Sequence, residues 1–248
     1  MRICVLGDSH ITSLKLSYDG LSEPLKKQIQ ATFFASRGVG LKALSADGGR
    51  LVSRDAAVAK DICFTSEGSG TIEAEHFDLF LIHSVGFCYP YPLFTECFYS
   101  QGFLMGTVQR FWEQRLFFYL YKELRKITPK PIVLSPQPYQ SEMGSKTVTQ
   151  VATSPTNAPD MEFFKACFAN RLDGSVSFLM QPAETVVDTI FTAERYCVDA
   201  LRLDVGDLTP ENNKHPVRDY LHMNALYGDC VWRDFLGHNS EVFQVLET

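Results

Sequence analysis

The sequence lacks the cysteine patterns of disulfide-rich and zinc-binding proteins. Its seven cysteines include no Cys-x-x-Cys pair, and their number is odd. Clusters of cysteine and histidine with metal-ligand spacing are also missing, so we expect no metal and no other cofactor. Reduced thiols are the usual state in the cytoplasm, and a cytoplasmic location is therefore expected.

Basic runs and long apolar segments are absent as well. The formal net charge is −6, and without a basic stripe nucleic acid is not expected as a partner. No segment reaches the length of a membrane span without charges, so no membrane partner is expected either. The apolar run Ile3–Leu6 is far too short for the core of a signal peptide.

Apolar runs are present, but they are short and alternate with helical stretches. The runs are continuous, which is typical of strands buried on both faces of a parallel sheet. Their alternation with helices indicates a doubly wound α/β fold. The expected strands are Ile3–Leu6, Ala31–Ala35, Phe77–Ile82, Pro131–Leu134 and Ala200–Val205. The expected helices are Leu104–Ile127, Met161–Leu172 and Met223–Leu236, besides an amphipathic segment that begins near Ile11.

The length of 248 residues and a hydrophobic content of 45% suit one domain over residues 1–248. Two stretches exceed a minimal α/β domain and predict insertions near 86–103 and 137–160. Gly86–Phe103 is dense in aromatic residues, and Gln137–Asp160 is rich in Pro, Ser and Thr, as in a long mobile loop. Both follow strand ends, so they are candidates for a lid or a substrate wall. The aromatic stretch equally suits a satellite core cluster or an oligomer contact.

The first ten residues carry the strongest functional signal. The run Ile3–Leu6 ends at Gly7, and Asp8-Ser9-His10 follows before the amphipathic segment. This pattern predicts a strand, a tight turn and a helix, with Ser9 at the carboxyl edge of the sheet and at a helix N-terminus. Ser9 is therefore a candidate nucleophile. Its alternative role is to cap the first helix, and Asp8 is expected to be a turn or capping residue.

A candidate base for Ser9 lies near the other end of the sequence. Asp219 and His222 are three positions apart, which lets the carboxylate hold Nδ1 of the imidazole and leaves Nε2 free to take a proton. The alternative is that His222 caps the last helix. His10 directly follows Ser9, but neighbouring residues on a helix point to different faces, so His10 is not the expected base.

Gly7-Asp8-Ser9 after the first strand, with Asp219-x-x-His222 near the C-terminus, resembles the SGNH (GDSL-like) hydrolase superfamily. The resemblance is tight in these two segments and rests elsewhere on the order of elements. It implies a flavodoxin-like three-layer α/β/α fold with a parallel central sheet and ester or acyl chemistry. The α/β-hydrolases share the order Ser, Asp, His, but they require Gly-x-Ser-x-Gly, which does not occur here.

The resemblance also implies an oxyanion hole, which is a set of donors for the developing negative charge. The Ser9 N–H is one donor, and a glycine after the second strand is another; Gly40 is preferred, with Gly38 as the alternate. The family's third donor is an asparagine, but the corresponding place here reads His83-Ser84-Val85-Gly86. Loss of one donor costs roughly 2.7–4 kcal/mol of transition-state stabilisation. Candidate substitutes are His83, Ser84 and Gln137.

Three functions remain in competition. The leading interpretation is a serine esterase or acyl-transfer enzyme acting on a small O-acylated substrate, such as an acetylated small molecule or glycan. The second is a non-catalytic SGNH-like binding or accessory protein with an impaired oxyanion hole. The third is an α/β protein whose resemblance to the superfamily is accidental. The sequence leaves the acyl group, the alcohol, the choice between hydrolysis and transfer, and the oligomeric state open.

Overall fold

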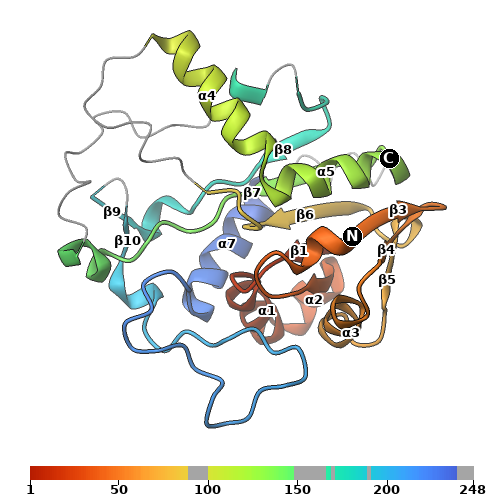
Figure 1. Cartoon of the computed structure of the whole chain (residues 1–248). Helices are drawn as coiled ribbons and strands as arrows, with labels where there is room; N and C mark the ends of the chain where they lie inside the picture. Colours follow the sequence, from red (N-terminus) through yellow and green to blue (C-terminus); the bar gives the residue numbers. More distant parts are fainter. Residues whose placement is uncertain (89–99, 148–165, 169–170, 189–190, 239–248) are drawn as a thin grey trace.

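The computed structural model describes residues 1–88, 100–147, 166–168, 171–188 and 191–238. Its centre is a sheet of five strands in the order β2-β1-β6-β7-β8, and all neighbouring pairs are parallel (Figure 1). Numbered along the chain, this order is 2-1-3-4-5, which is the flavodoxin-like arrangement. The strands are β1 (Arg2–Gly7), β2 (Gln30–Ala35), β6 (Leu79–His83), β7 (Ile132–Ser135) and β8 (Val176–Phe178). The predicted α/β class with a parallel central sheet is confirmed.

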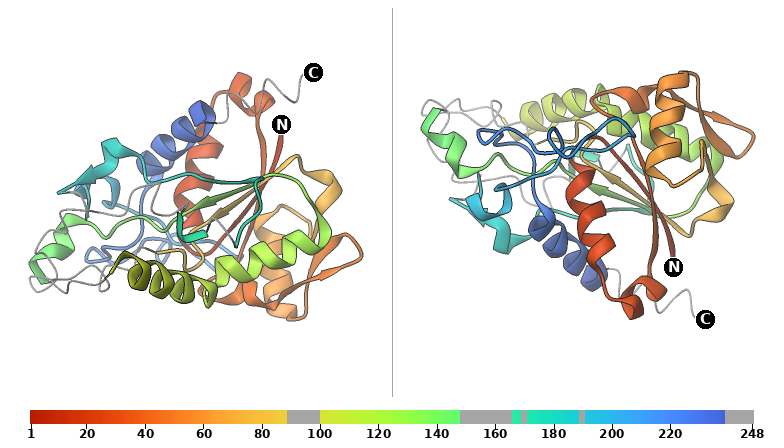
Figure 2. Two further views of the ribbon diagram at one scale, coloured as in Figure 1. Left: turned by 90° about the horizontal axis from the view of Figure 1, so that it is seen from above. Right: turned by 90° about the horizontal axis from the view of Figure 1, so that it is seen from below.

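Helices cover both faces of this sheet and complete three layers (Figure 2). Because side chains alternate along a strand, Ile3 and Val5 of β1 pack on one face, and Cys4 and Leu6 pack on the other. The first face is covered by α1 (Ile11–Gly20) and α7 (Ala225–His238). The second is covered by α3 (Ala56–Thr65), α4 (Gln101–Glu113) and α5 (Leu116–Ile127), while α2 (Glu23–Gln28) precedes β2.

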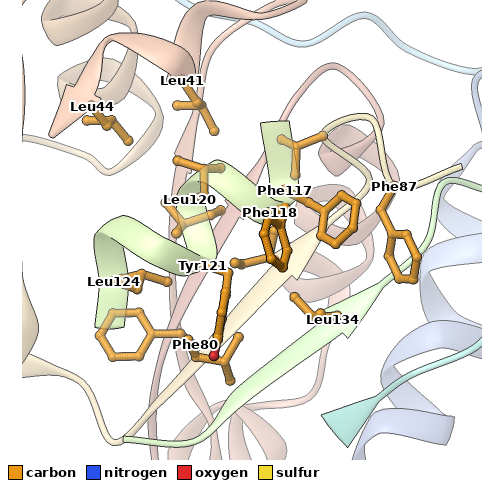
Figure 3. Packing of buried hydrophobic residues seen from close by; sticks show 14 of the residues in the cluster. Leu41, Leu44, Phe80, Phe87, Phe117, Phe118, Leu120, Tyr121, Leu124 and Leu134 are labelled. Carbon is orange, nitrogen blue, oxygen red and sulfur yellow. The ribbon is translucent and has the colours of Figure 1, made fainter. Parts of the chain in front are cut away.

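An aromatic cluster fills the space between β6, β7 and α5 (Figure 3). Phe87 follows β6 and is 1% exposed. The centroid of its ring lies 4.5 Å from the ring centroid of Phe117 and 5.4 Å from that of Trp112. The beginning of the aromatic stretch Gly86–Phe103 is thus part of the core, while residues 89–99 lie outside the described residues.

The predicted strand Ala200–Val205 is wrong. This segment is a loop whose only ladder contact in the described part of the chain is an isolated bridge between Leu201 and Lys214. Leu203 and Val205 are nevertheless buried against the α1 and α7 face. The alternation of apolar and charged residues in this segment arises because one side of the loop packs against the helical layer, and not because the segment joins the sheet. The fifth strand of the sheet is instead β8.

The predicted helix Leu104–Ile127 is two helices, α4 and α5. Arg115 is extended between them, with φ −89° and ψ 157°. The break lets α5 dock its own N-terminus, since the Phe117 N–H donates to the carbonyl of Val85 after β6. Apolar periodicity continues through the break, so the pattern alone does not mark it.

A small antiparallel sheet, β3-β4-β5, was not among the expected elements. Gly48 and Gly49 form the two-residue connection between β3 and β4, and both have positive φ. A Gly-Gly pair between short strands is a known hairpin signal. These strands are β3 (Leu44–Asp47), β4 (Arg50–Ser53) and β5 (Thr71–Glu73), and a two-stranded ribbon is formed by β9 (Val186–Val187) and β10 (Phe191–Thr192). Short 3-10 helices are η1 (Gly40–Ala43), η2 (Ala74–His76), η4 (Glu142–Thr147), η5 (Ala183–Thr185) and η6 (Glu194–Tyr196).

The helix expected over Met161–Leu172 and the loop expected over Gln137–Asp160 lie partly outside the described residues. Of the helix expected over Met161–Leu172, residues 166–168 are helical and residues 161–165 and 169–170 are not described. Of Gln137–Asp160, the described beginning is held by hydrogen bonds. The Tyr139 N–H donates to Gln181, and the Thr192 hydroxyl donates to the carbonyl of Tyr139. The mobile loop predicted there does not include this beginning.

Candidate active site

Ser9 lies in a tight turn at the carboxyl end of β1, which lies between β2 and β6 in the sheet. The turn is closed by the Ile11 N–H, which donates to the carbonyl of Asp8, and α1 starts there. Gly7 is required at the strand end, since a Cβ on it would lie 2.7–3.0 Å from the side chain of Ile11. Gly7 pairs with Ala35 of β2 and His83 of β6. The segments that follow all three strands therefore surround Ser9.

The structure brings Ser9, His222 and Asp219 together from opposite ends of the chain. Ser9 Oγ lies 2.8 Å from His222 Nε2, and His222 Nδ1 lies 2.9 Å from Asp219 Oδ2. Asp219 Oδ1 accepts the backbone N–H groups of Leu221 and His222, so the carboxylate also folds the loop around itself. The hydroxyl of Ser9 thus contacts an imidazole, and His10 rather than Ser9 is the residue that precedes α1.

Two further histidines stack on the ring of His222. His215 lies on one face, with ring centroids 3.8 Å apart and planes inclined by 11°. His10 is stacked on it as well, at 4.6 Å and 15°. His215 Nδ1 lies 2.9 Å from Asp219 Oδ2, the same oxygen that His222 contacts. His215 was not among the expected site residues, although it lies four residues before Asp219 in the sequence.

Burial favours the uncharged form of these imidazoles. It lowers the pKa of His10 to about 4 and that of His215 to about 4. Burial also lowers the pKa of His222, with a contribution from His10, while Asp219 acts in the opposite direction. Burial raises the pKa of Asp219, but hydrogen bonds from Leu221 and His222 outweigh it and hold this pKa below its usual value. A neutral imidazole beside an ionised carboxylate is the state that a general base needs.

Asp8 lies below Ser9 and is enclosed by the turn after β6. Its carboxylate accepts the N–H of His10 at 3.1 Å and the hydroxyl of Ser84 at 3.3 Å. Burial raises the pKa of Asp8 to about 6, although these hydrogen bonds act against the shift. Asp8 therefore ties the Ser9 turn to the segment after β6.

That segment is strained where the resemblance implies an asparagine. Ser84, Val85 and Gly86 all have positive φ, at 64°, 39° and 77°. Such values cost about 1–3 kcal/mol for a residue other than glycine and persist only where the surroundings impose them. Here the Ser84 N–H donates to the carbonyl of Ser135, and the carbonyls of Ser84 and Val85 accept further N–H groups. This turn offers no side-chain amide.

The three candidate substitutes for the asparagine differ in their partners. His83 is fully buried, and its Nδ1 lies 3.0 Å from Ser135 Oγ. The Ser84 hydroxyl is already engaged with Asp8. The Gln137 side chain is half-buried and has no hydrogen-bond partner in the described part of the chain, while its backbone N–H donates to the carbonyl of Phe87.

The two candidate glycines differ in the same way. The Gly40 N–H points back to the carbonyl of Arg37 at 3.2 Å, and a Cβ on Gly40 would lie 2.2 Å from Ser36 Oγ. Gly38 has φ +60°, and within the described ranges its N–H donates to no protein group. The Ser9 N–H is likewise unused there. The backbone N–H groups of Ser9 and Gly38 are thus available to a bound ligand, whereas the Gly40 N–H is engaged with the carbonyl of Arg37.

His215, Asp219 and His222 also place ligand-type atoms within 4.8 Å of one another. A metal ion is held near the plane of each imidazole ligand, along its nitrogen lone pair. Two rings stacked at 3.8 Å and inclined by 11° cannot both meet that condition for one ion. This group is therefore better described as two imidazoles on one carboxylate than as a metal centre.

Comparisons with known proteins give distant likenesses only. No protein-family model and no curated protein matches the sequence. A family two carbohydrate esterase from Clostridium thermocellum aligns over 98% of this chain with 11% identity and a TM-score of 0.40. A candidate platelet activating factor from Streptococcus pneumonia aligns over 95% of this chain with 10% identity and a TM-score of 0.43. This chain spans 64% of the length of the first and 82% of the second. Among the described helices, none combines the length and the apolar character that a membrane span requires.

Proposed function

We propose that this protein is a serine esterase or acyl-transfer enzyme of the SGNH type. The observation that carries this proposal is the hydrogen-bonded series from Ser9 through His222 to Asp219 at the carboxyl edge of the sheet. Ser9 is the nucleophile, His222 is the general base and acid, and Asp219 orients His222 and stabilises its charged form. The neutral state of His222, favoured by burial, supports the role of base.

The reaction proceeds through an acyl-serine. Ser9 Oγ bonds to the carbonyl carbon of the ester, and its proton passes to His222 Nε2. The electron pair of the carbonyl moves to its oxygen, and the N–H groups of Ser9 and Gly38 donate to that negative charge. The bond to the alcohol then breaks, and the alcohol leaves with the proton from His222. Water or a second hydroxyl repeats the attack on the acyl-serine and restores Ser9.

The substrate that we propose is a small acetylated molecule or glycan. The described beginnings of both predicted insertions leave the sheet at the edge that holds Ser9, after β6 and after β7. An enzyme for long-chain lipids needs a broad apolar surface near its serine, and a sequence rich in Pro, Ser and Thr after β7 is a poor source of one. p-Nitrophenyl acetate should therefore react faster than long-chain p-nitrophenyl esters, and an acetylated sugar panel tests the glycan. Faster turnover of the long-chain esters would contradict this choice of substrate.

Covalent labelling of Ser9 tests the enzyme directly. A fluorophosphonate should add once to the wild-type protein, as seen in the intact mass, and not to Ser9→Ala. Ser22→Ala, which removes an exposed serine at the start of α2, is the matched control and should be labelled like the wild type. Ser9→Ala should also lower kcat for p-nitrophenyl acetate by about 10³-fold or more.

A non-catalytic binding protein is the second candidate, and the turn at His83–Gly86 is the observation that favours it. A folded wild-type protein that takes no fluorophosphonate and hydrolyses none of these esters would support it. Binding of an acetylated sugar, measured by calorimetry on the same sample, would then be the expected activity.

A further inference from the structure

Two imidazoles compete for one carboxylate oxygen beside Ser9. His215 Nδ1 and His222 Nδ1 each lie 2.9 Å from Asp219 Oδ2, and the two rings are stacked. Asp219 Oδ1 accepts two backbone N–H groups, so the carboxylate is saturated with donors. We propose that His215 is a positioning residue, which fixes Asp219 and the ring of His222 and reduces the share of the carboxylate charge that His222 receives. This inference rests on the proposed function, since it gives His222 the role of base.

The shared oxygen fixes the tautomer of both rings. An ionised carboxylate has no proton to donate, so each Nδ1 that contacts it carries a hydrogen. Both Nε2 atoms are then left with a lone pair. In His222 this lone pair faces Ser9 Oγ, as proton abstraction requires. In His215, Nε2 is buried without a partner among the described residues. This burial disfavours protonation of Nε2, so His215 stays neutral.

The competition has a defined sign. A second N–H donor on Asp219 Oδ2 stabilises the carboxylate and weakens its pull on a proton at His222. Removing the donor of His215 should therefore raise the pKa of His222. The other charged or titratable groups around His222 are Asp8 before Ser9 and His10 at the residue before α1, and the change leaves both in place. Arg202 acts on His215 rather than on His222.

Stacking is the second effect of His215, and it can be separated from the hydrogen bond. His222 is stacked on His215 and on His10, and these flat contacts restrict the rotation of its ring. Phenylalanine at position 215 keeps a ring there and removes the donor. Asparagine keeps an N–H donor close to the place of Nδ1 and removes the ring. Comparison of the two variants thus separates the effect of the hydrogen bond to Asp219 from the effect of ring stacking on His222.

Titration of His222 by NMR, with isotope-labelled histidine, is the decisive experiment. In His215→Phe the pKa of His222 should rise by about 0.5–1 unit, and in His215→Asn it should stay close to the wild-type value. His76→Phe, at an exposed position, is the control and should change nothing. The acid limb of the kcat/KM profile for p-nitrophenyl acetate should move by the same amount. Equal shifts in both 215 variants, or no shift in His215→Phe, would overturn the inference.

The readouts separate this inference from the proposed function. The NMR titration needs no turnover, so a shift in a protein without esterase activity would refute the function and retain the competition. The wild type offers a test that no folding defect can disturb. Both His215 and His222 should show a downfield, slowly exchanging Nδ1 proton, and detection of only one of the two would refute the shared carboxylate.

Discussion

At the scale of single residues, the site combines two short sequence motifs with features that neither motif contains. The resemblance implied Ser9, Asp219 and His222, and these side chains do meet. The surrounding imidazoles were not predictable, because stacking depends on how the loop before α7 folds over the Ser9 turn. The place of the missing asparagine holds a strained turn without a side-chain amide, in which the Ser84 hydroxyl is engaged with Asp8 and His83 Nε2 is buried without a partner among the described residues. The proposed esterase therefore needs its third oxyanion donor from His83 or from another segment.

Gln137 is the candidate for that donor whose side chain is only half-buried and whose amide has no partner in the described structure. If its amide serves the oxyanion, Gln137→Ala should lower kcat for p-nitrophenyl acetate by about 10²–10³-fold with little change in stability. Gln140→Ala, in the same segment, is the control and should retain the wild-type kcat. Equal rates in the Gln137 variant and the wild type would remove Gln137 from the oxyanion hole.

His83→Ala should behave differently from Gln137→Ala. His83 is fully buried and contacts Ser135, so its loss leaves a cavity and an unpaired hydroxyl. We expect the free energy of unfolding to fall by about 2–4 kcal/mol, measured by urea denaturation, while kcat of the folded fraction changes little. A large loss of kcat at unchanged stability would instead make His83 a donor.

At the scale of elements, the packing of α1 against α7 places the two halves of the site (Figure 2). α1 starts two residues after Ser9, and α7 starts three residues after His222. The Trp232 indole donates to the carbonyl of Leu14, and the Ser17 hydroxyl donates to Asp229. A fixed distance between these helices therefore sets the distance between Ser9 and His222.

Gly228 tests this coupling, because it lies at a close contact between the two helices. A Cβ at this position would lie 2.1 Å from the carbonyl oxygen of Ser13, which is backbone and cannot move aside. Gly228→Ala should push the helices apart and destabilise the protein by roughly 1–3 kcal/mol. It should also lower kcat/KM for p-nitrophenyl acetate, since Ser9 and His222 separate.

Gly20→Ala is the matched control for Gly228→Ala. Gly20 ends α1, and a Cβ there would meet nothing within 4 Å. Alanine is the better helix former by up to about 1 kcal/mol, so thermal denaturation should show unchanged or higher stability with full activity. Similar losses in both variants would indicate a general sensitivity of α1, not a close contact at Gly228.

The sequence predicted the elements that are long and buried on both faces. Four strands of the five-stranded sheet, β1, β2, β6 and β7, were expected, because continuous apolar runs are typical of a parallel sheet. The strand β8 has three residues, which is too short for such a signal. Ala200–Val205 carried a stronger strand signal but covers helices. A local apolar pattern indicates that a segment is buried, but the tertiary structure decides whether it packs in the sheet or against helices.

At the scale of the whole molecule, the fold encloses a group of uncharged histidines around one end of its sheet. Burial lowers the pKa of His10 to about 4, that of His83 to about 3 and that of His215 to about 4. Asp8 is affected in the opposite sense, since burial raises its pKa to about 6. These buried residues near Ser9 therefore make the stability of the protein depend on pH.

The direction of this dependence follows from proton counts in the folded and unfolded states. At pH 5 an unfolded histidine with a pKa of about 6.5 is protonated, whereas His10, His83 and His215 in the folded protein are mostly not. The unfolded state thus binds about three more protons there, and the extra proton that folded Asp8 retains offsets about one of them. A net difference of about two protons means that, near pH 5, the free energy of unfolding decreases by roughly 3 kcal/mol for each unit by which the pH is lowered. Stability is fully present above about pH 6.5 and is lost as the pH falls toward 4.

Urea denaturation at a series of pH values between 4.5 and 7.5 measures this slope. The midpoint should be nearly constant above pH 6.5 and should fall steeply below it. His83→Gln, which removes one of the buried titrating groups, should reduce the slope by about one proton, or roughly 1.4 kcal/mol per pH unit. His76→Gln, at an exposed position, should leave the slope unchanged. A midpoint that stays constant down to pH 4.5 would mean that these histidines take up protons in the folded protein at the same pH as in the unfolded chain. Burial would then not lower the pKa of His222 either, since its ring lies among the same side chains, and a neutral His222 would rest on the ordinary pKa of histidine alone.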